Sequence, residues 1–172
     1  MTDVIERHDE AGAVDGAAES AVSIVLWTRR PVCGPRTDVI DRLAALSTAG
    51  HLSGFAVETW PEEVVVSEPG RHEALLDRID RFEQWAADNG LSVRPPFQTR
   101  TKSPLVGRSE TVLKTPMLFA AAYEGDTLVG VYPCSDGEQT WTVPEYLDAI
   151  ERRDEQPHDT GERPVPAVGD GR

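Results

Sequence analysis

Apolar residues change their spacing along this chain, and each change predicts a different element. A mostly apolar run at residues 22–28 predicts a strand. Apolar residues then recur at helical spacing, which predicts a helix over 36–49 that stops at Gly50. A second stripe of the same spacing predicts a helix over about 71–89, ended by Asn89-Gly90. The chain therefore alternates between strand and helix from its first ordered segment.

The other apolar runs are short and bounded by turn residues, so they predict strands. These runs lie at 55–59, 64–66, 117–123 and 128–132, and the turn signal Asp136-Gly137 predicts a further short strand at about 138–141. The first two form a strand pair broken by Trp60-Pro61, and the runs 117–123 and 128–132 form a hairpin. Residues 91–114 are expected to be mostly loop or edge strand, because Pro95, Pro96 and Pro104 exclude a central strand.

A capping box, Thr142-Val-Pro-Glu145, predicts the start of a last helix. The order is then β-α-β-α-β-β-α, which predicts an α/β fold with a mixed sheet flanked by helices. A thioredoxin-like sheet is the first choice, and a ferredoxin-like split βαβ is the alternative. Residues 1–20 and 153–172 show no periodicity and are expected to be disordered tails around a single domain at 21–152.

Charge is the strongest signal in the composition. The chain holds 30 acidic and 17 basic residues, a net charge of −13, and only Lys102 and Lys114 are lysine. Such a surface repels itself in dilute buffer and is screened in molar salt, which favours a halophilic, haloarchaeal source over an acidic protein from a high-GC organism. No apolar run approaches the roughly 20 residues of a membrane span, and the first residues lack a secretory signal. We expect a cytoplasmic protein.

The turn Cys33-Gly34-Pro35-Arg36, between the first strand and the first helix, resembles the turn of thioredoxin-type chains. Thr115-Pro116, ahead of a later strand, resembles the proline that faces that turn, and the resemblance implies that Pro116 is cis. Arg36 stands where the second cysteine would be, so the dithiol is missing. If this is a thiol protein, Cys33 and Pro116 are its candidate residues.

Cys134 is the other cysteine that could resolve a disulfide with Cys33. In a thioredoxin-type sheet the strand at 128–132 is parallel to the first strand, and the 117–123 strand lies between them. Two inter-strand steps then separate the cysteines by about 9–10 Å. A disulfide needs Cα atoms within about 7 Å, so we expect two reduced thiols.

Two short segments depart from the general acidity. Residues 29–36 have basic but no acidic side chains, and residues 91–116 have Glu110 as their single acid. Together they hold eight candidate residues for binding a nucleic acid or an anionic ligand: Arg29, Arg30, Arg36, Arg94, Arg100, Lys102, Arg108 and Lys114. The alternative is that these side chains pair with acidic neighbours. Because a purely electrostatic contact weakens in salt, Phe97 or Trp60 would have to add stacking.

No other local pattern indicates a catalytic centre. The histidines His8, His51, His72 and His158 have no metal-ligand spacing with each other or with cysteine, and no glycine-rich phosphate loop is present. We expect no metal, no cofactor and no enzyme activity. Partners stay open between an anionic ligand, a nucleic acid and another protein, without a membrane.

Larger pieces of the core resemble a family of small haloarchaeal proteins labelled "helix-turn-helix domain". The stretches are Val39-Ile-Asp-Arg-Leu43, Phe55-Ala-Val-Glu-Thr-Trp60, Phe82-Glu-Gln-Trp-Ala86, Pro95-Pro-Phe97, Thr115-Pro-Met-Leu118, Tyr123-Glu-Gly-Asp-Thr-Leu-Val129 and Pro133-Cys-Ser-Asp-Gly137. The resemblance covers residues 22–151 and implies DNA binding and transcriptional regulation. The first two predicted helices, however, are some twenty residues apart, and a helix-turn-helix joins its helices by a turn of about three or four residues.

Two functions therefore stand side by side. The first is a non-catalytic regulatory or binding protein that acts through the basic residues. The second is a thioredoxin-like thiol protein that acts through Cys33.

Overall fold

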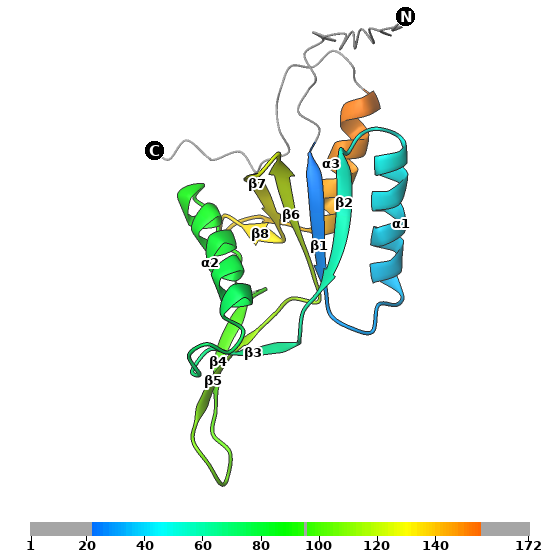
Figure 1. The fold of residues 1–172 in the computed structure, drawn as a ribbon. Helices are drawn as coiled ribbons and strands as arrows, with labels where there is room; N and C mark the ends of the chain where they lie inside the picture. Colours follow the sequence, from blue (N-terminus) through cyan, green and yellow to red (C-terminus); the bar gives the residue numbers. More distant parts are fainter. Residues whose placement is uncertain (1–21, 95, 156–172) are drawn as a thin grey trace, which may run out of the picture.

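The computed structural model describes residues 22–155 apart from residue 95 (Figure 1). Its elements, in chain order, are β1 (Ser23–Thr28), α1 (Pro35–Thr48), β2 (Gly54–Thr59), β3 (Glu63–Val65), α2 (Glu73–Asp88), β4 (Gln98–Lys102), β5 (Glu110–Lys114), β6 (Leu118–Glu124), β7 (Thr127–Tyr132), β8 (Cys134–Ser135), β9 (Thr140–Trp141) and α3 (Val143–Glu155). None of these helices is both long enough and apolar enough to cross a membrane.

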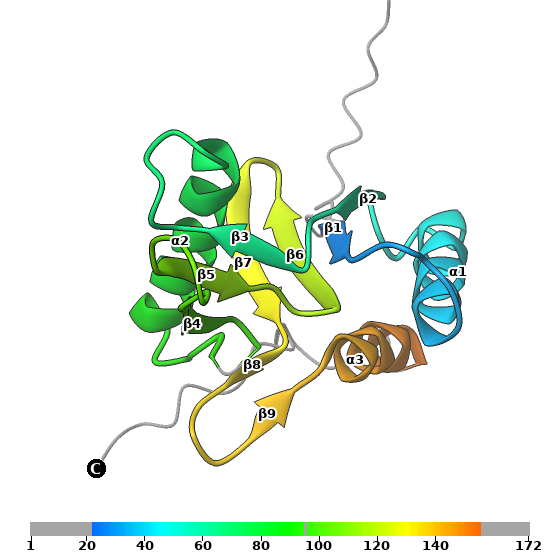
Figure 2. The same ribbon diagram turned by 90° about the horizontal axis from the view of Figure 1, so that it is seen from below.

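The main sheet is mixed and has the order β2-β1-β6-β7. Strands β1 and β2 are parallel, whereas β6 is antiparallel to both β1 and β7. Helices α1 and α3 lie together on one face of this sheet, and α2 covers the opposite face (Figure 2). The predicted α/β class, a mixed sheet flanked by helices, is therefore confirmed. Strand β6 lies between β1 and β7, and β7 is parallel to β1. This is the arrangement expected for the segments 117–123 and 128–132.

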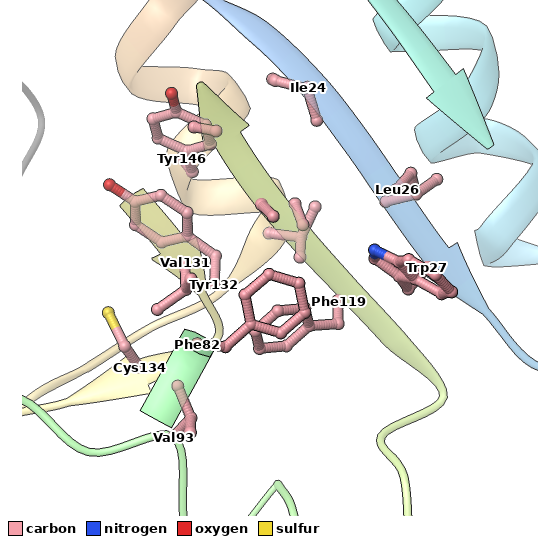
Figure 3. Packing of buried hydrophobic residues seen from close by; sticks show 14 of the residues in the cluster. Ile24, Leu26, Trp27, Phe82, Val93, Phe119, Val131, Tyr132, Cys134 and Tyr146 are labelled. Atoms are coloured by element: carbon pink, nitrogen blue, oxygen red, sulfur yellow. The ribbon is translucent and has the colours of Figure 1, made fainter. Parts of the chain in front are cut away.

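The core forms because the central strands are apolar on both faces. Leu26 and Trp27 are neighbours on β1 and point to opposite faces, and both are buried. Phe82 of α2 packs against Phe119 of β6, with ring centroids 5.0 Å apart (Figure 3). Three consecutive alanines of β6, residues 120–122, are fully buried. Their small side chains let the layers on both sides approach the strand closely.

A second sheet, of order β3-β5-β4, corrects two predictions. The segments 55–59 and 64–66 are not a strand pair, because β2 joins the main sheet and β3 joins this one. Residues 91–114 are mostly loop or edge strand, as predicted, because β4 lies at the edge, but the exclusion of a central strand is wrong for β5, which lies between β3 and β4. The prolines of this segment precede β4 or lie in the turn after it, so they flank the strands without removing a ladder donor.

The last helix begins as predicted. The backbone N–H of Thr142 donates to the carboxylate of Glu145 at 2.7 Å, and the N–H of Glu145 lies 3.4 Å from Oγ1 of Thr142. These are the reciprocal bonds of a capping box. Helix α3 runs to Glu155, so three of its residues lie in the range that we predicted as a tail. The rest of both predicted tails lies outside the described residues.

The prediction of a cis Pro116 is wrong. Among the described residues the cis peptide bonds are Arg30–Pro31 and Tyr132–Pro133, and the Thr115–Pro116 bond is trans. A cis proline typically serves a tight turn. Here the chain passes from β5 to β6 through three residues, 115–117, without such a turn. The thioredoxin likeness, on which the cis bond rested, stays a prediction.

Candidate nucleic-acid interface

One face of the second sheet carries basic side chains. Arg100 and Lys102 are two residues apart on β4. The strand register places Arg100 opposite Val112 and Gln98 opposite Lys114. Because side chains alternate between faces, Arg100, Lys102 and Lys114 stand on the same face of the sheet. We call these three residues the basic face. The opposite face contributes Val64 and Leu113 to the core.

Two glutamates partly neutralise the basic face. The ammonium of Lys102 contacts the carboxylate of Glu63 in an ion pair. This hydrogen bond, together with the charges of Lys102, Arg100 and Lys114, holds the pKa of Glu63 below its ordinary value. The carboxylate of Glu62 lies 4.0 Å from Nζ of Lys114. Glu63 therefore remains ionised at neutral pH. A third carboxylate, Glu110, stands opposite Lys102 on the same face, so the basic face is a surface of mixed charge.

Strands β4 and β5 form a hairpin, residues 98–114, which we call the arm. It projects away from the rest of the molecule at the bottom of Figure 1. The hydroxyls of Ser103 and Ser109 lie 3.0 Å apart and close the base of its turn. Between them, Leu105 is 105% exposed, Val106 is 91% exposed, and Arg108 is exposed as well. The arm thus combines a basic stem with an apolar tip.

Arg29 and Arg30 follow the end of β1, Arg36 lies in the first turn of α1, and the roles of the three residues differ. The side chain of Arg29 is only 14% exposed, and its guanidinium donates to the carbonyl of Thr115 and lies 3.3 Å from the carboxylate of Glu62. Arg36 donates from Nη1 to the carbonyl of Arg29 at 2.9 Å. Glu62 is therefore shared between Arg29 and Lys114, and it links this end of β1 to the basic face. Arg30 is exposed.

Arg94 is separated from the basic face. Its guanidinium pairs with Glu83 of α2 at 2.8 Å and donates to Oγ1 of Thr99 at 3.1 Å. Thr99 precedes Arg100 on β4 and points to the other face of the sheet. The eight candidate residues therefore divide into the basic face with Arg108, the cluster at the end of β1, and Arg94 on the side of α2.

The two aromatic residues expected to stack on a ligand are buried, so that expectation is wrong. Trp60 is 3% exposed, stacks on Trp27 at 5.2 Å, and donates from Nε1 to the carbonyl of Pro116. Phe97 is fully buried and packs edge-on against Trp60. Sequence reasoning missed the apolar groups that are exposed, Leu105 and Val106. The signal was the run Pro-Leu-Val-Gly at 104–107, which places two large apolar residues inside a turn.

The two cysteines are free and lie in different surroundings. Cys33 is exposed, and Nη2 of Arg36 lies 3.6 Å from its Sγ. Cys134 is buried in the core, and this burial raises the pKa of its thiol to about 12. A thiol held protonated in this way is a poor nucleophile at neutral pH. In the described part of the chain, no group of three or more His, Cys, Asp or Glu residues could hold a metal ion.

Comparison with known proteins identifies one family. Residues 16–155 match the family described as "Helix-turn-helix domain", which is most of the chain. No curated protein and no solved structure shows a significant match. In residues 22–155 no two helices are joined by a short turn, because β2 and β3 separate α1 from α2, and six strands separate α2 from α3. A binding surface in this chain therefore has to be sought outside a helix pair.

Proposed function

Because the chain belongs to the helix-turn-helix domain family, we propose that it is a non-catalytic, DNA-binding regulatory protein of the haloarchaeal cytoplasm. It contacts DNA through the basic face and the arm. The observation that carries the proposal is the strand register, which aligns Arg100, Lys102 and Lys114 on one face of the second sheet. Lysine and arginine side chains arranged in this way fit the phosphates of a duplex.

The helices are poorer candidates for this contact. Arg78 and Arg81 of α2, together with Arg71 just before the helix, are outnumbered by acidic side chains. Those acids are Glu73, Asp77, Asp80, Glu83 and Asp88. Arg78 is also engaged over the ring of Trp27, 5.3 Å from its centroid. A helix with this balance repels a phosphate backbone, whereas the arm carries four basic residues and one acid, Glu110.

The alternative that Cys33 carries out thiol chemistry has one observation in its favour. The Sγ of Cys33 is exposed and lies 3.6 Å from Nη2 of Arg36. Against it, Arg36 occupies the place of a second cysteine, and the other thiol of the chain is buried. Dithiol exchange therefore lacks its resolving partner. We place this function second.

The experiment is a titration of a fluorescent duplex with the full chain by anisotropy over a range of KCl concentrations. The variant Arg100→Ser with Lys102→Ser removes two phosphate contacts, so the slope of log K against log [KCl] should become less negative by about 2. The matched control is Arg81→Ser with Arg152→Ser, which removes two exposed arginines from helices. Its slope should equal that of the wild type. Equal binding by the wild type and the Arg100, Lys102 variant would refute the proposal.

A further inference from the structure

We infer that the arm is a minor-groove wedge: its tip inserts Leu105 and Val106 between base pairs of duplex DNA while its stem contacts the phosphates. This inference rests on the proposed function and goes beyond it, because it assigns the element that enters the groove and the deformation of the DNA that follows.

The tip is the unusual part of the arm. Leu105 and Val106 are the most exposed of the large apolar residues that the structure describes, at 105% and 91%, and the next, Met117, is 54% exposed. The turn that connects the two strands of a solvent-exposed hairpin is ordinarily built from small and polar residues. Two adjacent large apolar side chains at the far end of a projecting hairpin instead mark a surface that becomes buried on binding.

The order of side chains along the arm indicates the partner. The tip is apolar, Arg108 lies beside it, and Lys102 and Arg100 follow along β4. Two residues of a strand advance about 7 Å, which is about twice the 3.4 Å rise per base along one DNA strand. Cations at this spacing can contact every second phosphate of one DNA strand while the tip reaches the base pairs. Proteins that kink DNA from the minor groove combine the same two parts, apolar wedges and basic side chains.

The dimensions of the groove explain why insertion would deform the duplex. The minor groove of B-DNA is about 6 Å wide, so only the tip of a two-stranded ribbon can enter it at first. Insertion of a leucine or valine side chain unstacks a base step and bends the duplex by tens of degrees towards the major groove. The opened groove then admits the flanks of the tip, including Arg108.

The wedge also resolves a difficulty that the charges raise. Contacts between Lys102 or Arg100 and phosphates depend on counterion release, and they weaken steeply as salt rises. Burial of Leu105 and Val106 releases no counterions and is not weakened in this way. In a high-salt cytoplasm the apolar tip would therefore supply a larger share of the affinity than the basic face.

The test uses two labelled duplexes and the full chain. One duplex carries 2-aminopurine at a central step, and its fluorescence rises when the base is unstacked. The other carries a donor and an acceptor at its ends, and its energy transfer rises when the duplex bends. The variant is Leu105→Ser with Val106→Ser, and the control is Val32→Ser, an exposed apolar residue outside the arm.

We expect the wild type and the Val32 variant to give both signals. The tip variant should lose both signals and bind at least about tenfold more weakly, because burial of one large apolar side chain is worth more than a factor of ten in affinity. Its slope against log [KCl] should stay that of the wild type, since no phosphate contact is removed. Its circular dichroism and urea midpoint should also be unchanged, because both side chains are exposed.

Three results would overturn the inference. If the wild type binds DNA without either signal, the wedge is wrong while the proposed function stands. If the wild type binds no DNA, both fall together. If the tip variant keeps full DNA binding and instead converts a dimer to a monomer in light scattering, the tip contacts a second copy of this chain.

Discussion

Arg29 is one of the eight basic residues singled out in the sequence, yet its surroundings assign it a structural role. It follows the last residue of β1, and its guanidinium reaches across to the carbonyl of Thr115, just after β5. The same guanidinium pairs with Glu62, just before β3. Arg29 therefore joins the main sheet to the second sheet. Replacement by alanine removes both contacts and leaves the Thr115 carbonyl without this donor.

The size of the effect follows from these contacts. A hydrogen bond from a charged group contributes about 1.5–3 kcal/mol to the free energy of unfolding. The ion pair with Glu62 adds less than about 1 kcal/mol, because that carboxylate is 64% exposed. The Nε atom of Arg29 is buried without a hydrogen-bond partner among the described residues, which reduces the net gain. We therefore expect Arg29→Ala to lower the free energy of unfolding by about 2–3 kcal/mol.

The assay is urea unfolding in high salt, followed by tryptophan fluorescence and far-ultraviolet circular dichroism. Trp27 and Trp60 stack close to this junction, so their fluorescence reports its opening. Glu62→Gln should cost less than about 1 kcal/mol. Arg108→Ala should leave the midpoint unchanged, because that side chain is exposed on the arm. A loss below about 0.5 kcal/mol for Arg29→Ala, the usual range of a surface substitution, would refute the reasoning.

Four further outcomes are expected. Gly130→Ala should cost about 1–3 kcal/mol, because a Cβ there would lie 3.1 Å from the buried ring of Tyr132; urea midpoints check this. Thr142→Ala should cost about 1 kcal/mol by removing the cap of α3, also measured in urea. Cys33→Ser should leave DNA affinity unchanged, and the wild type should show no turnover in an insulin-reduction assay. Burial raises the pKa of Cys134 from 9.0 to about 12, so the native state keeps a proton that the unfolded state releases. The free energy of unfolding should fall between those pH values, and Cys134→Ala should remove that part of the loss.

Three strands of the main sheet, β1, β6 and β7, could be predicted because their signals are local. The apolar run of β1 and the apolar stripe of α1 are visible in any short window, and the bonds between Thr142 and Glu145 follow from a four-residue motif. The second sheet could not be found in this way. Its strand β5 contains Thr, Lys and Glu beside Val112 and Leu113, and one of its two neighbours, β3, is distant in sequence. Only tertiary packing decides that such a strand is central.

The candidate site was predictable in composition but not in arrangement. A local excess of arginine and lysine at 91–116 is plain in the sequence. Which of these side chains share a face depends on the register of β4 against β5, and the pairing of Arg94 with Glu83 depends on where α2 lies. Trp60, at the break before Pro61, was expected to be available for stacking on a ligand. Its indole instead has a partner in the carbonyl of Pro116, which allows it to be buried.

The pleat of the arm restricts how its length can change during evolution. Each residue adds about 3.4 Å to a strand, and successive side chains alternate between the two faces. If one residue were inserted into each strand between Arg100 and Lys102, the tip would move outward, but Lys102 would point to the opposite face of the sheet, which carries Val64 and Leu113. If two were inserted into each strand, the reach would grow by about 7 Å and the alignment of Arg100, Lys102 and Lys114 would be kept. Relatives with longer or shorter arms should therefore differ by even numbers of residues per strand.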